Sequence, residues 1–510
     1  MLGAVAPVVG MLAACSTSAA APGSASARAA ATLRPGAVSV PSAVTRLPAA
    51  ADSVLADQAP GSLTAAFARA LFASAPVVVV SAATGKPLAA AVAAARTAHA
   101  PVLLASASTK PAMAQLAAAA RTLHPVAVLA AGLAGPAQAQ LAAALPGVEV
   151  VARAAALPAT RTPQPLSRVA VLVPEGIKPT SPLAAVGATA QAAGVAVIGM
   201  AGTDPRADPV AITVLARLRP DAVVAVGAQF GPAARLAGNV AVAETGRQLP
   251  GGGQVMFPER RLVALYGHPG TPGLGVLGQQ DLAASIARAK RMAAAYRPLS
   301  RVPVVPAFEI IASVAEASPG PDGSYSYETP VSDLLPWVRR ATADGLYVVL
   351  DLQPGRASLL AQAEHYQSLL ELPDVGLALD AEWKLQPGQR PLRQIGHVDV
   401  GEVNRVVGWL AALTAERDLP QKLLVLHQFQ LAMIRGEQDL DTSHDDLSIV
   451  IHMDGQGTPG VKQSTWNAVT AAAPRGVYFG WKNFLVKDHP MLTPAQTMTK
   501  TPTPVMISYQ

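Results

Sequence analysis

Short runs of Val, Leu, Ile and Ala alternate along most of the chain with longer stretches in which apolar and polar residues recur at helical spacing. Six runs fall in the first half: APVVVVSA (75–82), APVLLAS (100–106), PVAVLAAG (125–132), RVAVLVPEG (168–176), GVAVIGMAG (194–202) and DAVVAVGAQ (221–229). Continuous apolar runs separated by amphipathic helices are typical of parallel strands that are covered on both faces. The pattern predicts two small α/β units with parallel sheets, over 66–160 and 161–253.

Eight further apolar runs follow the glycines at 251–253. They are LVALYGH (262–268), VPVVPAFEII (302–311), LYVVLDLQ (346–353), VGLALDAEW (375–383), KLLVLHQF (422–429), LSIVIHMDG (447–455), GVYFGWK (476–482) and PVMISYQ (504–510). Helical patterns such as 281–296 and 401–417 lie between most of them. Eight strands with intervening helices in about 250 residues are what a (β/α)8 barrel requires. The chain is therefore predicted to be α/β, with two small parallel-sheet units followed by a TIM-type barrel at 257–510.

The first 65 residues have a different character. Residues 1–14 are almost wholly apolar, too short for a membrane span and typical of the apolar region of a signal peptide. They end in Leu12-Ala13-Ala14-Cys15, which resembles the lipobox of bacterial lipoproteins. This resemblance implies cleavage before Cys15, a lipid anchor on that cysteine, and a place on the extracytoplasmic face of the cell membrane. Residues 15–65, rich in Ala, Ser, Pro and Thr, are predicted to be a tether.

Composition and charge exclude several classes of protein. Cys15 is the only cysteine, so no intrachain disulfide can form. The 39 Lys and Arg exceed the 33 Asp and Glu only slightly and form no block, which argues against a nucleic-acid partner. Neither small unit carries a G-x-G-x-x-G turn, so a dinucleotide site is disfavoured and no cofactor is expected.

The first unit resembles the cell-wall-binding repeat type 2 of surface proteins of Gram-positive bacteria. It shares a strand, an Ala-rich helix, a strand ending in PVLLAS, a second helix, and a further strand that reads VLAAG (128–132) where the repeat has two glycines. The resemblance implies that the unit binds cell-wall polysaccharide or peptidoglycan. A structural or spacing role for the two units is the alternative.

The carboxyl ends of the predicted barrel strands are rich in ionisable and aromatic side chains. They carry His268, Glu309, Asp351 with Gln353, Asp380 with Glu382, His427 with Gln428, His452 with Asp454, Trp481 with Lys482, and Tyr509 with Gln510. In (β/α)8 enzymes the active site lies at this end of the barrel. Burying many acids destabilises a fold, and sequences retain such groups where function requires them. We therefore predict a functional site at this end.

Asp380 and Glu382 end the predicted fourth strand in the sequence LDAEW. Alternate side chains of a strand share a face, so the two carboxylates are expected side by side. Glycoside hydrolysis needs such a pair, one carboxylic acid and one carboxylate, and crowding raises the pKa of one of them. The candidate catalytic residues are Glu382, Asp380, Asp351, Glu309 and Asp454. Candidate substrate-binding residues are Tyr266, Trp383, Trp481 and Tyr509 as sugar platforms, together with His268, His427, Gln428 and His452. No metal is assigned in this interpretation.

The D-x-E of this strand resembles that of family 25 lysozymes and the end of the family 18 chitinase signature. The resemblance implies that Glu382 is the general acid and that Asp380 assists the N-acetyl group of the substrate. Val375 and Ala378 stand where the chitinase signature has Asp, so the resemblance is to glycosidase-like barrels as a group. Lys482, rather than a carboxylate, ends the seventh strand, which favours substrate assistance or an inverting water over a covalent intermediate.

Two other interpretations remain open. A metal-dependent hydrolase could use His268, His427, His452, Asp351 and Asp454 as ligands, although no H-x-H or H-E-x-x-H spacing fixes them. YGHPG resembles the first strand of glycerophosphodiester phosphodiesterases. The third interpretation is a lipoprotein that binds glycan without catalysis. Peptidoglycan, arabinogalactan-like chains and α-glucan are all compatible substrates.

Overall fold

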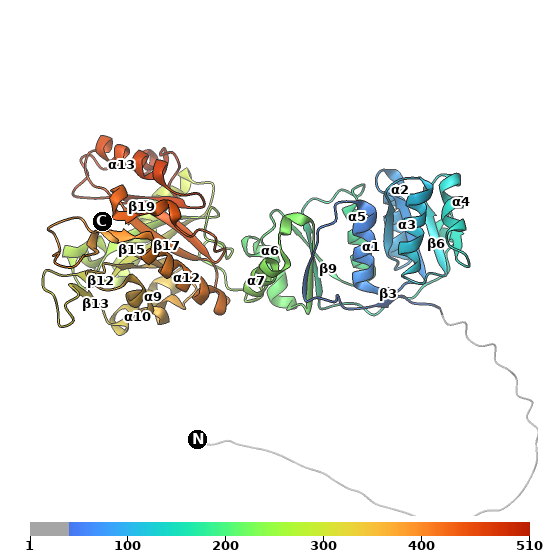
Figure 1. The fold of residues 1–510 in the computed structure, drawn as a ribbon, viewed down its shortest axis with the longest axis horizontal. Coiled ribbons are helices and arrows are strands. Elements are labelled where there is room, and N and C mark those ends of the chain that lie inside the picture. Colours follow the sequence, from blue (N-terminus) through green and yellow to red (C-terminus); the bar gives the residue numbers. More distant parts are fainter. Residues whose placement is uncertain (1–39) are drawn as a thin grey trace, which may run out of the picture. The chain divides into compact units, whose positions relative to one another are not determined.

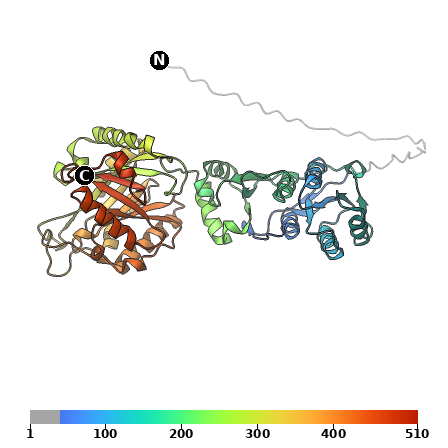
Figure 2. The ribbon, with the colours of Figure 1, turned by 90° about the horizontal axis from the view of Figure 1, so that it is seen from above.

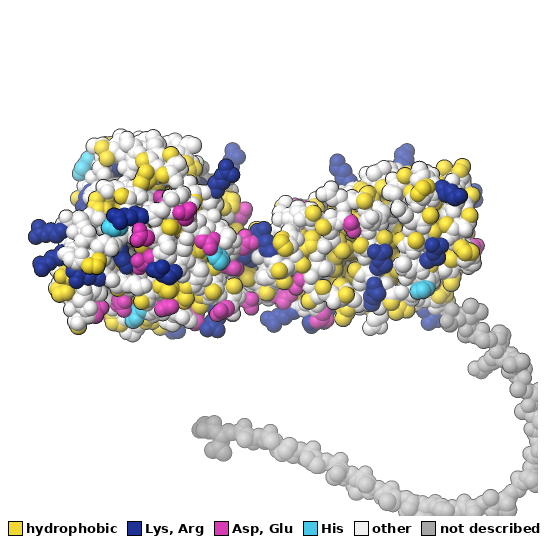
Figure 3. All heavy atoms as spheres, in the orientation of Figure 1, with side chains coloured by type: hydrophobic (Ala, Val, Ile, Leu, Met, Phe, Trp, Pro, Cys, Tyr) yellow, Lys and Arg dark blue, Asp and Glu magenta, His cyan; other side chains and the backbone are white. Residues whose placement is uncertain are grey.

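The computed structural model describes residues 40–510. The predicted signal peptide, Cys15 and the first part of the predicted tether lie outside the described residues. None of the helices in the described part is long and apolar enough to cross a membrane. On the face shown in Figure 3, basic and acidic side chains are interspersed over the surface.

The first α/β unit contains a four-stranded parallel sheet in the order β5-β4-β6-β7. Its strands are β4 (Val77–Ala82), β5 (Val102–Ala105), β6 (Ala127–Ala131) and β7 (Glu149–Val151), and its helices are α1 (Pro60–Leu71), α2 (Lys86–Thr97), α3 (Lys110–Arg121) and α4 (Gly135–Ala143). Val78 and Val80 pack with residues of α1 and α3 on one face, while Val77 and Val79 pack with residues of α2 on the other. Both faces of β4 are thus covered, as its continuous apolar run predicts.

The second α/β unit has a four-stranded parallel sheet in the order β2-β10-β8-β9. Its strands are β2 (Asp52–Leu55), β8 (Val169–Pro174), β9 (Ala196–Met200) and β10 (Ala222–Val226), and its helices are α5 (Leu183–Ala192), α6 (Pro209–Leu218) and α7 (Ala233–Glu244). Strand β2 pairs with β10 at the sheet edge, and β1 (Val44–Thr45) pairs with β3 (Phe72–Ser74). The chain is therefore already structured before residue 65, within the segment expected to be a tether.

The C-terminal part is a closed barrel of eight parallel strands, which confirms the predicted (β/α)8 fold (Figures 1 and 2). Its strands are β11 (Arg261–Gly267), β12 (Val304–Ala315), β14 (Tyr347–Leu352), β15 (Val375–Asp380), β17 (Lys422–Gln428), β19 (Leu447–Met453), β20 (Tyr478–Asn483) and β21 (Met506–Tyr509). Pairing of β11 with both β12 and β21 closes the ring. All eight apolar runs are strands, including the last one.

Helices lie outside the barrel strands in Figures 1 and 2. They are α8 (Leu282–Tyr296), α9 (Val331–Ala343), α10 (Leu359–His365), α11 (Gln367–Leu370), α12 (Val400–Glu416), α13 (Pro459–Ala472) and α14 (Pro494–Met498). Short strands decorate the loops: β13 (Ser326–Glu328) extends β12 antiparallel, and β16 (Val398–Asp399) pairs with β18 (Ile434–Arg435).

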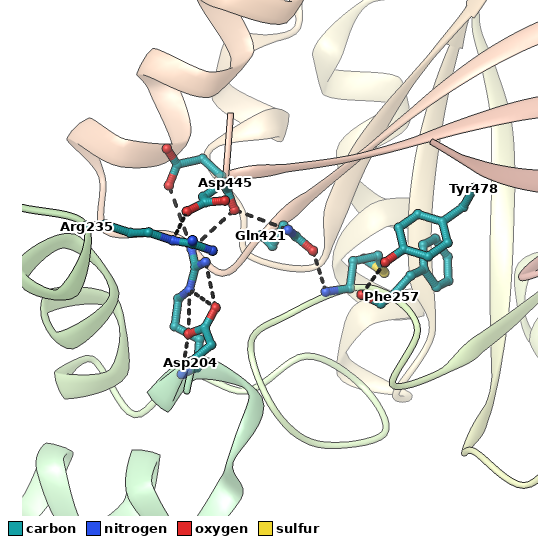
Figure 4. Close-up of polar contacts among 9 residues, drawn as sticks. Asp204, Arg235, Phe257, Gln421, Asp445 and Tyr478 are labelled. Carbon is teal, nitrogen blue, oxygen red and sulfur yellow. Dashed lines mark hydrogen bonds and ion pairs between the residues drawn. The ribbon is translucent and has the colours of Figure 1, made fainter. Parts of the chain in front are cut away.

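The barrel interior is apolar over most of its depth. Its lumen-facing side chains form one cluster that includes Leu262, Ala264, Val305, Ala307, Tyr347, Val349, Ala378, Leu423, Val425, Val450 and Met506. Met256 and Phe257, which precede β11, pack into the same cluster. The Met256 N–H donates to Gln421 Oε1 at 2.8 Å, and the Tyr478 hydroxyl donates to the Phe257 carbonyl at 3.1 Å (Figure 4). The amino-terminal end of the barrel is thus filled and cross-linked.

Figure 4 also draws an ionic cluster beside this segment. Arg206 is buried and donates to Asp204 Oδ2 at 2.8 Å and to the Asp445 carbonyl at 3.3 Å. Arg235 forms an ion pair with the Asp445 carboxylate. Both contacts with Asp445 involve the loop at the amino-terminal end of β19, opposite the candidate site.

Candidate active site

The lumen changes from apolar to wholly polar at the carboxyl ends of the barrel strands. Along each strand, the next lumen-facing position after the apolar cluster of the barrel interior carries a polar side chain. These residues are Tyr266, Glu309, Asp351, Asp380, His427, His452, Lys482 and Ser508. Each of these eight residues, which we call the polar layer, is no more than 3% exposed. Neighbouring strands place these residues either directly opposite one another or offset by two residues. Because side chains alternate with a period of two, both arrangements aim all eight side chains inward.

His427 bridges two carboxylates across the barrel. Its Nε2 lies 2.8 Å from Glu309 Oε1, and its Nδ1 lies 3.1 Å from Asp454 Oδ2. Burial would lower the pKa of His427, but the charge of Glu309 and the hydrogen bonds to Asp454 and Glu309 raise it well above its usual value. With a carboxylate acceptor at each ring nitrogen, His427 is an imidazolium that donates in both directions.

Asp351 occupies the space between His427 and Tyr266. The Tyr266 hydroxyl donates to Asp351 Oδ2 at 2.8 Å, and the other oxygen, Oδ1, lies 3.7 Å from His427 Nε2. Burial raises the pKa of Asp351 to about 6, against the opposing charge of His427. Its titration midpoint therefore lies near pH 6, well above that of an ordinary aspartate.

Asp380 and Glu382 meet through a turn and not through strand alternation. Strand β15 ends at Asp380, and Ala381–Trp383 form a 3₁₀ turn in which the Glu382 N–H donates to Asp380 Oδ1 at 3.2 Å. The turn still leaves the two carboxyl groups together. One oxygen each of Asp380, Glu382 and Asp454 lie within 4.8 Å of one another. Asp380 is buried, whereas Glu382 is partly exposed at the opening.

The three carboxyl groups differ in their electrostatic environments. Burial and the nearby Asp351 raise the pKa of Asp380 well above its usual value, and burial and Asp454 raise the pKa of Glu382. For Asp454 the hydrogen bond from His427 and the charge of that ring outweigh burial, so its pKa is lowered. The surroundings therefore favour protonated Glu382 beside ionised Asp454, the division expected of an acid and a carboxylate partner.

His452 is a neutral neighbour of this cluster. Its ring stacks on His427 with centroids 5.3 Å apart, and its Nε2 lies 2.9 Å from Ser508 Oγ. Burial and the His427 charge lower the pKa of His452 well below its usual value. A Cβ at Gly480 would lie 3.0 Å from this ring, so the glycine makes room for it.

Several predicted site residues lie outside the polar layer. Trp481 is fully buried against Trp466 of α13, with ring centroids 5.5 Å apart, and the Tyr509 hydroxyl lies 2.6 Å from that of Tyr296 on α8. Adjacent side chains of a strand point to opposite faces, so these two rings face the helices and offer no surface to a sugar. This placement removes both from the candidate sugar platforms.

The remaining candidates also lack a contact with the acid cluster. Gln428 Nε2 donates to Glu437 Oε2 at 2.9 Å, and His268 Nε2 lies 3.1 Å from Thr329 Oγ1. Trp383 ends the turn after β15 and is partly exposed, so it remains a candidate platform. Ser508 joins the polar layer without having been predicted, and Lys482 had been noted only as the residue that ends the seventh strand. Each is adjacent in the chain to a predicted sugar platform, Tyr509 or Trp481, so a shift of one residue along the strand would have identified both.

Comparison of the chain with protein-family models, with curated proteins and with solved structures found no match. A surface cavity of about 630 Å³ lies in the first α/β unit between α1 and α3, away from the polar layer. Its walls combine small apolar side chains with polar ones, and Asp57 and Arg69 are the only ionisable residues that line it. The chemistry of the described residues is thus concentrated in the barrel.

Proposed function

We propose that the barrel hydrolyses a glycosidic bond of a cell-envelope glycan, with Glu382 as the general acid. The observation that carries this proposal is the convergence of Asp380, Glu382 and Asp454, with the pKa of Glu382 raised and that of Asp454 lowered. A protonated carboxyl group at the opening can give its proton to the leaving oxygen, while a nearby carboxylate stabilises the positive charge that develops on the sugar.

Asp454 is the better candidate for that charged partner. Asp380 is given the assisting role by the resemblance to the chitinases. Its raised pKa favours the neutral form, however, and a neutral carboxyl group orients a substrate by donating a hydrogen bond. The nearest oxygens of these carboxyl groups lie within 4.8 Å of one another, which is less than the roughly 6.5 Å or more that separates the carboxyl groups of inverting enzymes. This favours retention, through Asp454 or through the N-acetyl group of the substrate.

The test is release of reducing ends from purified cell-wall fractions. Wild-type protein should release them, Glu382→Gln should not, and the variant should still be retained by the glycan. Glu364→Gln, which changes an exposed carboxylate on α10, is the matched control and should be as active as wild type. Retention of glycan without any release by wild type would instead support the non-catalytic binding interpretation.

Attachment to the membrane is part of the proposal and is supported by the lipobox-like sequence at Cys15. In this arrangement the first α/β unit, with its cell-wall-binding-repeat-like pattern, holds the barrel near its substrate. Mass spectrometry of the mature amino terminus would detect the lipid, and Cys15→Ala should release the protein from the membrane fraction.

A metal-dependent hydrolase is the second candidate, because three carboxylates within 4.8 Å of one another could bind a divalent cation. The imidazolium of His427 and the ammonium of Lys482 oppose a cation there, which is why we rank it second. Elemental analysis of the purified protein and activity after treatment with a chelator separate the two. Activity that persists without metal excludes this candidate.

A further inference from the structure

Lys482 is a buried cation with no carboxylate partner. It belongs to β20, the seventh barrel strand, and is 3% exposed. Its Nζ lies 3.5 Å from the centroid of the Tyr266 ring and 5.5 Å from that of Phe484. Among residues 40–510 no carboxylate oxygen lies within 4.0 Å of this ammonium. A buried ammonium is costly without a counter-ion, and contact with aromatic faces offsets only part of that cost.

Three acids of this region already have hydrogen-bond partners, whereas the carboxyl group of Glu382, which also interacts with Lys482, has none among the described residues and has a raised pKa that favours its neutral form. Glu309 and Asp454 both accept hydrogen bonds from His427, and Asp351 accepts one from Tyr266. The ammonium makes no hydrogen bond within the described residues, yet it is not among their fully buried atoms without a partner. Nζ is therefore slightly accessible to solvent, and the N–H donors that do not point at the Tyr266 ring are free to bind a ligand.

The loops on one side of the same opening are basic. Arg356 follows β14, while Arg390 and Arg393 follow β15, and all three side chains are exposed. An Arg356 guanidinium nitrogen donates to the Gln389 carbonyl at 3.0 Å, which joins the two loops. Neither 352–358 nor 384–398 contains an acidic residue. Loops that follow the barrel strands surround one mouth in this fold, and β14 and β15 lie across the ring from β20. The three arginines therefore add a positive field on the side of the mouth opposite Lys482.

We propose that Lys482 binds a carboxylate carried by the sugar next to the cleaved bond, so that the substrate is an acidic glycan. This inference rests on the proposed glycan-binding function of the barrel. A carboxylate fits better than a phosphate group, because one buried ammonium balances one negative charge and the lumen already contains several acids. The exposed arginines attract the polymer, and Lys482 selects the sugar that occupies the site.

The test measures binding in the Glu382→Gln background, so that it does not depend on turnover. The probes are peptide-free peptidoglycan strands and a polyuronate, each compared with the same polymer after its carboxyl groups have been reduced to alcohols. Reduction should weaken binding of at least one polymer by about tenfold or more, the loss expected for one charge-assisted hydrogen bond.

Lys482→Met should bind the acidic and the reduced polymer equally, and Lys482→Arg, which keeps the charge, should retain a preference for the acidic one. Lys290→Met, which removes a lysine on α8, is the matched control and should discriminate as the parent does. Equal binding of acidic and reduced polymer by the parent, no binding of either, or unchanged discrimination by Lys482→Met overturns the proposal. Carboxylate-dependent binding without release of reducing ends by wild type would leave it intact and reject hydrolysis.

Discussion

His427 Nδ1 lies 3.1 Å from Asp454 Oδ2, and this contact determines which acid at the barrel mouth carries charge. The same ring holds Glu309 at 2.8 Å through its other nitrogen, so its position is fixed from both sides. Asp454 is thereby kept ionised within reach of Glu382, which has no such partner and has a raised pKa. The chemistry proposed for the barrel depends on this difference.

Replacing His427 by Gln should shift the activity of the barrel to higher pH. Without the imidazolium, the pKa of Asp454 rises toward that of its buried neighbours, so the acidic limb of the pH–rate profile moves upward. The variant should also lose about 3 kcal/mol or more of stability, because Glu309 is left buried without its partner. The pH profile of reducing-end release and chemical denaturation measure the two effects. An acidic limb that stays at the wild-type pH would contradict the role given to His427.

Asp351→Asn should make the protein less sensitive to pH. The pKa of Asp351 is raised to about 6 in the folded protein, whereas in the unfolded chain it is near 3.9. Between these two pH values the unfolded chain releases the proton and the folded protein keeps it. The protein is therefore most stable below about pH 3.9 with respect to this group, and that stability is lost as the pH rises through about 6. The loss amounts to up to about 3 kcal/mol. Thermal unfolding of both proteins from pH 4 to 7 should show a difference that shifts in favour of the variant as pH rises, and a constant difference would refute the assignment.

Trp481→Phe should leave glycan affinity unchanged while lowering stability. The ring packs against Trp466 beneath α13, so the substitution removes buried contacts at a cost of about 1–3 kcal/mol and touches no part of the polar layer. Binding to wall fractions and thermal unfolding test the prediction. Trp383→Phe is the comparison, because Trp383 is partly exposed beside Glu382. A loss of affinity for Trp481→Phe alone would mean that the outward placement of Trp481 is wrong.

Gly480→Ala should destabilise the folded protein by displacing His452 from the polar layer. The added Cβ would lie 3.0 Å from the His452 ring, so His452 must move from its stack on His427, and the cost should be about 1–3 kcal/mol. Gly460→Ala in α13 is the control, since its Cβ meets no atom within 4 Å and helix propensity favours Ala by up to about 1 kcal/mol. Denaturation of both variants should show opposite signs, and equal effects would argue against the crowding at His452.

The eight barrel strands could be predicted because each is a mainly apolar run long enough to span the height of the barrel. The first strand of the second unit's sheet, β2, could not, since its four residues DSVL lie in a segment whose composition is that of a tether. Composition describes a segment on average, whereas the pairing of β2 with β10 depends on a partner about 170 residues away in sequence, as in Val223 opposite Asp52.

The candidate site could be predicted as a region but not as a set of contacts. The residues at the strand ends included Glu309, Asp351, Asp380 and His427, which do face the lumen. They also included Trp481 and Tyr509, which face the helices, because a shift of one residue along a strand moves a side chain to the opposite face. The hydrogen bonds of His427 join β17 to Glu309 on β12, 118 residues away in sequence, and to Asp454 just after β19, 27 residues away. No local pattern encodes such a contact, and it appears only when the ring of strands is closed.

The protonation states of Glu382 and Asp454 test the central claim most directly. Infrared difference spectroscopy of wild type against Glu382→Gln and against Asp454→Asn, followed across pH, assigns the carboxyl signal of each residue. The account predicts that Glu382 keeps its proton to a higher pH than Asp454 does. If Asp454 holds its proton to a higher pH than Glu382, or if the two titrate together, the assignment of acid and carboxylate at this barrel mouth is wrong.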